Sequence, residues 1–125
     1  MRTRQFRDLL VWQRSMRLAE EIYSATRGFP KEEMFGLASQ LRRAAVSVPS
    51  NIAEGQGRDT EKSFALFLNQ ARGSLYEVET QLELAGNLGM IPQETTARLL
   101  EMAAEIGRML HGLRNVLRRS NAPAG

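Results

Sequence analysis

Apolar residues recur at intervals of three and four in four stretches of the chain, which is the spacing of one face of an α-helix. These stretches predict helices at about residues 8–26, 32–54, 60–88 and 92–119. Residues 120–125 follow the last stretch, and we expect them to form a disordered tail. Glycine or proline stands in each interval between two stretches, as expected for turns.

Each stretch carries a stripe of apolar residues that we expect to face the core. In the first stretch the stripe consists of Leu9, Trp12, Met16, Ala19 and Tyr23, with Ile22 beside it. In the third, which is the most regular, it consists of Phe64, Leu68, Ala71, Leu75, Val78, Leu82 and Ala85. Such four-three spacing is typical of helices that pack as in a coiled coil. We expect Asp8 to cap the first helix and Asp59 or Thr60 to cap the third.

Pro49 interrupts the second predicted helix. Proline removes one backbone hydrogen bond and disfavours helical geometry at the residue before it. The helix therefore either kinks at Pro49 or breaks and restarts at Ser50. We favour a kink, because the apolar stripe continues in register to Ile52. Ser47, Ser50 and Asn51 flank the proline, and we expect them to satisfy the carbonyl groups that it frees.

The connections between the predicted helices are short, at about residues 27–31, 55–59 and 89–91. Short connections make consecutive helices antiparallel neighbours. The predicted fold is therefore all-α: one domain over residues 1–119 that forms an antiparallel up-down-up-down four-helix bundle. A three-helix fold, with the second helix melted at Pro49, is a much less favoured alternative.

Several apolar residues lie outside the main stripes. They are Leu10, Val11, Leu18, Phe35, Leu66, Phe67, Leu84, Leu100, Leu110 and Leu117. A small bundle on its own need not expose so many, so we expect the chain to bury part of them against other copies of itself. The alternative is a monomer whose apolar faces are wider than those of a coiled coil.

Composition excludes several classes of chemistry. The chain has no cysteine, which excludes disulfides, thiol catalysis, cysteine-bound zinc and iron–sulfur clusters. No segment has the roughly 18 consecutive apolar residues that suggest a membrane span. The first residues are charged and lack the apolar segment of a signal peptide. We therefore expect a cytoplasmic protein that does not bind membranes.

No arrangement of catalytic or metal-binding residues is found. The single histidine, His111, is expected on the flank of the fourth helix, and an arginine stands three positions before it. The Glu-x-x-His motif of di-metal bundles is therefore missing. Glu79 with Glu83, and Glu101 with Glu105, form i,i+4 pairs that are expected to be solvated. We predict no catalytic, metal or cofactor-binding residue, no cofactor and no small-molecule substrate.

Charge is distributed unevenly along the chain. Residues 1–17 hold five Arg and one Asp, and residues 108–125 hold four Arg and no acidic residue, so each segment has a net charge of +4. The intervening residues 18–107 have a net charge of −5. The predicted bundle brings both chain ends together with Arg58 and Lys62, so one end of the molecule should be basic and attract phosphate groups. Alternatively, the C-terminal arginines only complement a helix dipole and the terminal charge only aids solubility.

The candidate nucleic-acid-binding residues are the arginines of this end and a second group in the second helix. The first group is Arg2, Arg4, Arg7, Arg14, Arg17, Arg58, Arg114, Arg118 and Arg119, and the second is Arg42 and Arg43. Adjacent residues lie about 100° apart on a helix, so at most one of the second group can lie close to the apolar stripe. The alternative, at least as favoured as phosphate binding, is that one of them pairs with Glu77 or Glu79 of a neighbouring helix or subunit.

Residues 40–55 read QLRRAAVSVPSNIAEG, and this string resembles the signature of the bacterial four-helix bundle proteins encoded in 23S rRNA intervening sequences. The segments FRDL at 6–9, FP at 29–30 and ARGSL at 71–75 also resemble that family. The resemblance spans about residues 6–117. It implies a four-helix bundle that assembles as a homopentamer around a central channel.

The same family resembles the accessory protein of diversity-generating retroelements, which associates with a reverse transcriptase and with nucleic acid through a basic surface. The resemblance attaches no catalytic activity to the chain. Our first hypothesis is therefore a non-enzymatic, homo-oligomeric accessory protein that contacts RNA or a ribonucleoprotein through arginines. The alternative is a protein–protein interaction scaffold without nucleic-acid binding. An enzymatic role has only the presence of carboxylates in its favour.

Overall fold

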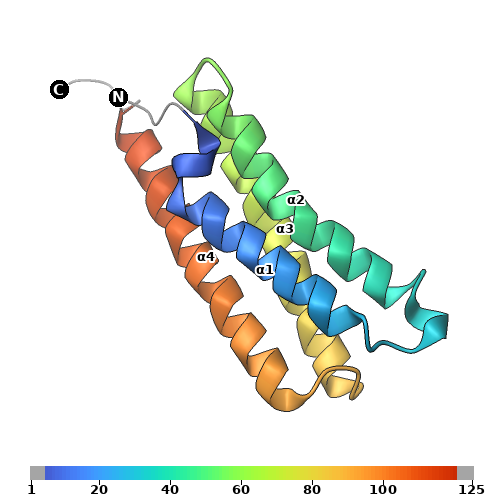
Figure 1. Cartoon of the computed structure of the whole chain (residues 1–125). Coiled ribbons are helices and arrows are strands. Elements are labelled where there is room, and N and C mark those ends of the chain that lie inside the picture. Colours follow the sequence, from blue (N-terminus) through green and yellow to red (C-terminus); the bar gives the residue numbers. More distant parts are fainter. Residues whose placement is uncertain (1–4, 121–125) are drawn as a thin grey trace.

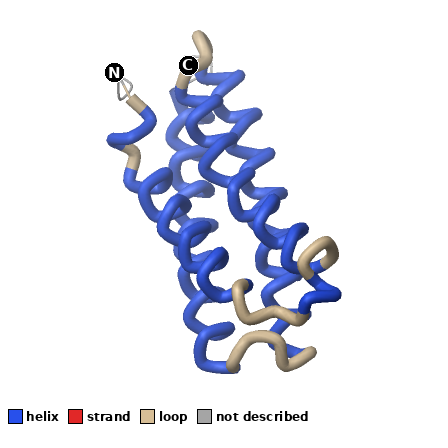
Figure 2. The backbone as a smooth tube through the Cα atoms, turned by 45° about the vertical axis from the view of Figure 1, so that its right-hand side comes forward, coloured by secondary structure: helices blue, strands red, loops and turns tan. Residues whose placement is uncertain are grey.

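The computed structural model describes residues 5–120. Within this range the chain is helical and has no β-strand. Four long helices lie side by side, and a short 3-10 helix precedes each of the first two (Figures 1 and 2). The elements are η1 (Phe6–Asp8), α1 (Leu10–Thr26), η2 (Lys31–Glu33), α2 (Leu37–Gln56), α3 (Glu61–Asn87) and α4 (Gln93–Ser120). The prediction of an all-α fold with four helices is confirmed.

Each long helix contacts two others, so the four surround one core. α1 and α3 both contact α2 and α4, whereas the diagonal pairs have no Cα atoms within 8 Å of each other among the described residues. Arg14 of α1 pairs with Glu105 of α4, and farther along α1 Glu21 pairs with Arg98. Residue numbers therefore rise along α1 while they fall along α4, which makes the two helices antiparallel. Accordingly, η1 and the last turns of α4 lie at the same end of the bundle (Figure 1).

The core takes in only part of the predicted α1 stripe, because Ala19 and Ile22 are buried as predicted whereas the other residues are not. Met16 and Tyr23 are exposed, and Leu9 and Trp12 are only half-buried. The residues that α1 buries are Val11, Ser15, Leu18, Ala19, Ile22 and Thr26. Both stripes have helical spacing, so α1 is apolar on two faces, and its neighbours α2 and α4 cover only one of them.

Two hydroxyl-bearing residues, Ser15 and Thr26, make the buried stripe of α1 difficult to recognise in the sequence. Ser15 donates to the carbonyl of Val11 at 2.7 Å, and Thr26 donates to the carbonyl of Ile22 at 2.8 Å. A hydroxyl that is satisfied within its own helix can be buried at little cost. The remaining residues of this stripe are aliphatic, so the face packs as core despite its two polar members.

The α3 stripe is confirmed. All seven of its predicted residues are buried, none of them more than 3% exposed. Midway along α3, the Ser74 hydroxyl lies 2.8 Å from the Ser47 hydroxyl of α2 and forms a hydrogen bond with it. Thr60 caps α3, as predicted, because its hydroxyl accepts a hydrogen bond of 3.0 Å from the amide of Ser63.

The first helix begins later than predicted. Residues Phe6–Asp8 form η1, in which the amide of Asp8 donates to the carbonyl of Gln5 at 3.1 Å. Leu9, in extended geometry, is the N-cap of α1, and no side chain caps this helix. The prediction that Asp8 caps the first helix is therefore wrong, because the backbone closes a separate 3-10 turn over Asp8.

The second helix also begins later, at Leu37 instead of about residue 32. Gly36 is not helical (φ −108°, ψ −113°), and it separates η2 from α2. A Cβ atom at Gly36 would lie 2.9 Å from Oε1 of Glu33, and the same oxygen accepts the amide of Leu37 at 3.2 Å. The Glu33 carboxylate thus joins the turn to the first residue of α2.

Pro49 lies inside α2, which continues through it as one helix. The alternatives of a break at Ser50 and of a three-helix fold are therefore wrong, and the kink stays a prediction. Asn51 donates to the carbonyl of Ser47 at 2.9 Å, whereas the carbonyl that loses its helical partner to proline is that of Ala45. Asn51 therefore does not satisfy the carbonyl that the proline frees, contrary to the prediction.

Candidate nucleic-acid interface

One end of the bundle gathers basic residues from segments that are far apart in the sequence. It is formed by η1, the turn between α2 and α3, and the last turns of α4 (Figure 1). Its described basic residues, which we call the basic end, are Arg7, Arg58, Lys62, Arg114, Arg118 and Arg119. The same segments hold the carboxylates Asp8, Glu54, Asp59 and Glu61. The positive excess is therefore smaller than the terminal segments of the sequence suggest.

Three arginines near the end of α4 carry most of the available charge. Arg114, Arg118 and Arg119 form no hydrogen bond or ion pair with any other residue in the range 5–120. Arg118 and Arg119 lie in the last turn of α4, where positive charge also suits the negative end of the helix dipole. Of the remaining predicted candidates, Arg2 and Arg4 lie outside the described residues.

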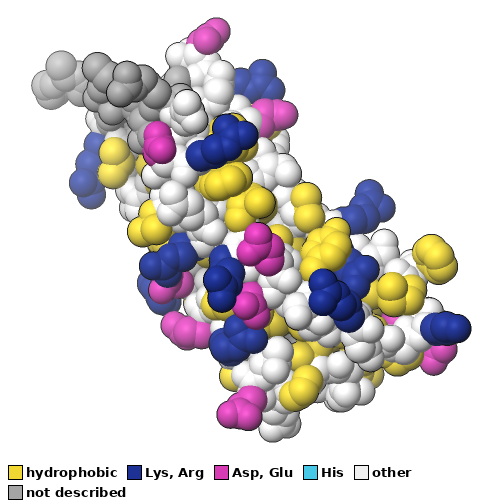
Figure 3. Space-filling model, viewed as in Figure 1, with side chains coloured by type: hydrophobic (Ala, Val, Ile, Leu, Met, Phe, Trp, Pro, Cys, Tyr) yellow, Lys and Arg dark blue, Asp and Glu magenta, His cyan; other side chains and the backbone are white. Residues whose placement is uncertain are grey.

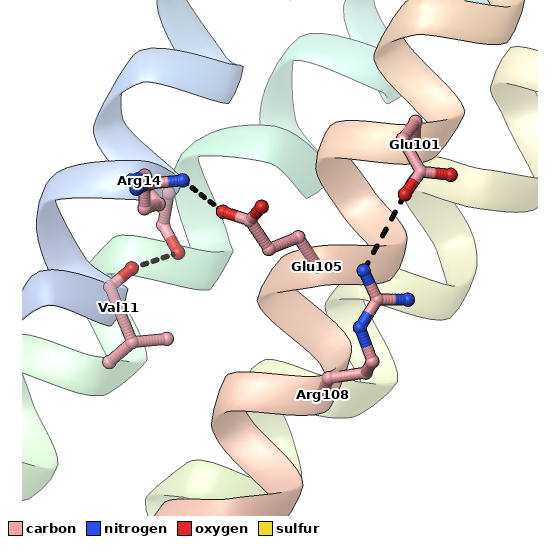
Figure 4. Close-up of polar contacts among 6 residues, drawn as sticks. Val11, Arg14, Glu101, Glu105 and Arg108 are labelled. Atoms are coloured by element: carbon pink, nitrogen blue, oxygen red, sulfur yellow. Dashed lines mark hydrogen bonds and ion pairs between the residues drawn. The ribbon is translucent and has the colours of Figure 1, made fainter.

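Arg14 and Arg17 do not join the basic end, because both pair with carboxylates on the side of the bundle. Arg14 reaches from α1 to Glu105 of α4 (Figure 4). Arg17 Nε lies 3.3 Å from Glu21 Oε2, and Arg98 of α4 approaches the other oxygen of Glu21 at 3.1 Å. The hydrogen bond from Arg98 is the main reason why the pKa of Glu21 lies below its ordinary value.

Two arginines of the basic end, Arg7 and Arg58, stack on aromatic rings. The Arg7 guanidinium lies 4.6 Å from the centroid of the Phe6 ring, and that of Arg58 lies 4.7 Å from the Phe67 ring. Arg58 also pairs with Glu54 at 3.6 Å. Stacking of this kind holds a guanidinium in place while its N–H groups remain exposed at the edge.

The second predicted group divides into a structural and an exposed residue. Half-buried Arg42 donates from Nε to Thr26 Oγ1 at 2.7 Å, and its guanidinium lies 4.8 Å from the Tyr23 ring centroid. These contacts join α2 to α1, so Arg42 has a structural role, although its partners are not the predicted glutamates. Arg43 is exposed. Together with Glu77 it lines a polar hollow of about 330 Å³ between α2 and α3, but Arg43 and Glu77 do not form an ion pair.

A charged hollow between α3 and α4 was missed in the sequence. It has a volume of about 330 Å³ and is lined by Arg72, Tyr76, Glu79, Arg108 and His111, among others. Arg72 donates to the Tyr76 hydroxyl at 3.1 Å, and burial raises the pKa of Glu79. The spacing of three or four residues within each helix indicates that the residues of α3 share one face and those of α4 another. Only the packing of α3 against α4 shows that these two faces meet. Two guanidinium groups and an imidazole could hold an anion there, opposed by Glu79.

A further concave surface lies between α1 and α2. We call it the apolar groove, and it has a volume of about 510 Å³. It is lined by Trp12, Met16, Ala19, Glu20, Tyr23 and Arg27 of α1 and by Val46, Pro49, Ser50 and Ala53 of α2. Apolar side chains gather at the surface over these two helices (Figure 3). The stripe of α1 that was predicted to face the core lines this groove instead.

Within residues 5–120, no three His, Cys, Asp or Glu residues are arranged to hold a metal ion. None of the helices in that range combines the length and the apolar character needed to cross a membrane.

The family model described as 23S rRNA-intervening sequence protein matches residues 7–112. The chain belongs to the 23S rRNA-intervening sequence protein family. No curated protein matches it. A crystal structure of a protein with unknown function from the S23 ribosomal protein family of Bacteroides thetaiotaomicron VPI-5482 has a TM-score of 0.76 to this 23S rRNA-intervening sequence protein. The two are 24% identical over 84% of this chain and 98% of that chain, which shows that they share the fold.

The family match confirms the resemblance seen in residues 40–55. It covers the apolar groove completely and the basic end only in part. The match ends at residue 112, so Arg114, Arg118 and Arg119 lie beyond it, whereas the apolar groove lies entirely within it.

Proposed function

We propose that this 23S rRNA-intervening sequence protein is a non-enzymatic, homo-oligomeric accessory protein that associates with RNA or a ribonucleoprotein through the basic end. The observation that supports this most is that Arg114, Arg118 and Arg119 have no partner among residues 5–120 and belong to the end of α4, which lies at the same end of the bundle as η1 and the α2–α3 turn. The proposal places the protein in the cytoplasm and requires no metal, cofactor or small-molecule substrate.

Phosphate groups are the ligand that suits this surface. The arginine guanidinium presents a planar fork of N–H donors that matches phosphate oxygens, and contacts with a phosphate backbone release counterions and depend strongly on salt. If copies assemble in parallel, as in the homopentamer that the family resemblance implies, their basic ends combine on one face of the assembly. Such a face would bind a nucleic acid more tightly than a single copy does.

The alternative is a protein–protein interaction scaffold without nucleic-acid binding. The apolar groove favours it, because an exposed apolar concavity is typical of protein interfaces. The two proposals differ in whether RNA binds at all, so the same experiment separates them.

Binding to RNA is tested by fluorescence anisotropy with a labelled single-stranded RNA from about 50 to about 200 mM salt. We expect the chain to bind at the lower salt concentration and to release RNA at the higher one. Replacing Arg114, Arg118 and Arg119 together with alanine should weaken binding and reduce the slope of log K against log salt by about two, because each lost phosphate contact removes about 0.7 from the slope.

The matched control replaces Arg14, Arg17 and Arg98 with alanine, which removes the same charge from residues that already pair with carboxylates. We expect it to keep most of the affinity. Absence of binding by the unaltered chain at about 50 mM salt would end the nucleic-acid proposal and leave the scaffold. Equal losses in the two triple variants would show that net charge, and not the basic end, attracts RNA.

A further inference from the structure

Phe35 is the most exposed large apolar side chain in the described part of the molecule. It is 98% exposed, whereas no other large apolar residue exceeds 58%. Isolated apolar residues on a surface are common, but an aromatic ring with almost no contact to its own chain is a large area left in water. Such a side chain is typical of the anchors that dominate protein interfaces.

The turn that carries Phe35 is held rigidly. Its amides donate in succession: Glu33 to Pro30 at 2.9 Å, Met34 to Lys31 at 3.1 Å, and Gly36 to Glu33 at 3.1 Å. Phe29, just before this turn, is buried, and Met34 packs against the core. The turn therefore points one ring inward and presents the other to solvent, so little conformational freedom is lost when Phe35 binds.

The apolar groove offers a complementary surface on the same molecule. Met16 is 36% exposed, and Tyr23 and Val46 are each 42% exposed, so the walls of the groove are accessible. The aromatic side chains of Trp12 and Tyr23 on α1 supply faces and edges for ring contacts. The volume of about 510 Å³ is within the range of pockets that enclose a ligand larger than one ring.

Phe35 cannot fill the groove of its own chain. It stands just before α2, and the first groove residue of α2, Val46, lies ten residues beyond Gly36, which is roughly 15 Å along a helix. The bonds that hold the turn keep the ring away from this position. The ring and the groove can therefore meet only between two molecules.

The charges around the two surfaces are also complementary. Glu20 and Arg27 lie at the rim of the groove, and Lys31 and Glu32 lie on the turn of Phe35. None of these four forms an ion pair within residues 5–120. Lys31 can meet Glu20, and Glu32 can meet Arg27, so both surfaces offer one charge of each sign.

We propose that Phe35 of one copy inserts into the apolar groove of a second copy. This inference rests on the homo-oligomeric part of the proposed function and names the contact that joins the copies. The ring and the groove are different patches of the same surface, so the contact is head-to-tail and repeats from copy to copy, and a closed ring forms if the rotation between copies closes. The partner of the apolar groove is then this chain itself.

The proposal is tested by light scattering and sedimentation of the full chain and of Phe35→Ala. We expect the unaltered chain to be larger than the 14.1 kDa of one copy, and Phe35→Ala to dissociate with a dissociation constant raised by about 30-fold or more. The matched control is Leu84→Ala, which shortens another exposed apolar residue and should keep the mass unchanged. Circular dichroism of each variant checks that the bundle is folded.

A second variant tests the groove side. Val46→Glu places a charge in the groove at an exposed position, and we expect it to dissociate as Phe35→Ala does. Mixing the two variants leaves one intact ring and one intact groove, so they should form a one-to-one pair and nothing larger. The absence of this pair at high protein concentration would overturn the proposal.

The outcomes separate this inference from the proposed function. If the unaltered chain is monomeric, both the homo-oligomer and this contact are wrong. If it is oligomeric and both Phe35→Ala and Val46→Glu keep its full mass, only the contact is wrong. RNA binding by dissociated Phe35→Ala, which keeps every arginine, shows whether the basic end acts in a single copy.

Discussion

At the scale of single residues, Gly55 marks a close approach of α2 to α3. A Cβ atom on Gly55 would lie 2.8 Å from Cβ of Phe67 and 2.9 Å from Cδ1 of Phe64. Both distances are shorter than the contacts that Cβ atoms make in proteins. α2 can therefore lie this close to α3 only because the residue is glycine. Gly73, on α3, is the opposite case, since no heavy atom lies within 4 Å of the position that a Cβ would take.

These two glycines give a paired prediction. We expect Gly55→Ala to lower the free energy of unfolding by about 1–3 kcal/mol, because overpacking outweighs the gain in helix propensity. Gly73→Ala should raise it by about 0.5–1 kcal/mol, because alanine restricts the unfolded chain and meets nothing in the fold. Urea denaturation at one protein concentration measures both. A Gly55→Ala variant as stable as the unaltered chain would contradict the close approach.

At the scale of elements, the sequence predicts the four helices well and their inward faces less well. The α3 stripe is predicted correctly because its seven residues keep the four-three spacing without interruption from Phe64 to Ala85. In α1 two apolar stripes have the same spacing, and the one with the bulkier residues was chosen as the core. That choice depends on which side α2 and α4 cover, and no local pattern within α1 contains this information.

The candidate arginines show the same limit. The residue type and the clustering near the chain end were sufficient to identify Arg114, Arg118 and Arg119 as candidate nucleic-acid-binding residues. The structure adds that they have no partner among residues 5–120. The pairing of Arg14 with Glu105 joins two helices that are distant in sequence, so it depends on the register between α1 and α4. A pairing of either Arg42 or Arg43 with Glu77 or Glu79 was one of two alternatives, and Arg42 instead meets Thr26, because the start of α2 lies beside the end of α1.

The ion pairs of Glu21 join α1 to α4 and predict a pH dependence. Its pKa in the folded chain lies below the ordinary 4.5, so its contribution is fully present above pH 4.5 and is lost as the pH falls through the lowered value. We expect Glu21→Gln to reduce the free energy of unfolding at pH 7 by less than about 1 kcal/mol, since the partner arginines are well exposed. The difference should narrow in acid.

Thermal melting at several pH values measures this effect. Glu83→Gln is the control, because Glu83 is exposed and has no ion pair among the described residues. A loss for Glu21→Gln that stays the same down to acid pH would mean that its ion pairs are not responsible.

At the scale of the whole molecule, the antiparallel order puts the start of the described chain and the end of α4 at one end of the bundle (Figures 1 and 2). This arrangement concentrates the basic end and leaves the turn of Phe35 at the opposite end. Phe35 is therefore remote from the basic end, so a change at Phe35 alters the proposed assembly and leaves the arginines in place. The apolar groove approaches the basic end more closely, because it extends along α1 to Trp12, whose ring centroid lies 5.2 Å from that of Phe6.

The same arrangement predicts that a circular permutant folds. A short flexible linker would join the two chain ends, and new ends would be opened after Gly89 in the turn between α3 and α4. We expect helical content and cooperative melting close to those of the original chain, as measured by circular dichroism. If α1 and α4 were parallel, the linker would have to span the 28 residues of α4, roughly 42 Å, and only a long-linker version would fold.

The hydrogen bond between Ser47 and Ser74 has a consequence for how α2 and α3 are aligned. An aliphatic seam tolerates sliding, because one leucine replaces another when a helix shifts by a turn of about 5.4 Å. A shift of that size would move the two hydroxyls apart and leave the buried Ser74 hydroxyl without this partner, at a cost of about 1–3 kcal/mol, whereas the Ser47 hydroxyl would keep the amide of Asn51. This hydrogen bond therefore fixes the alignment of α2 with α3. It adds little to the stability of the native alignment, but it raises the free energy of alignments that are shifted by one turn.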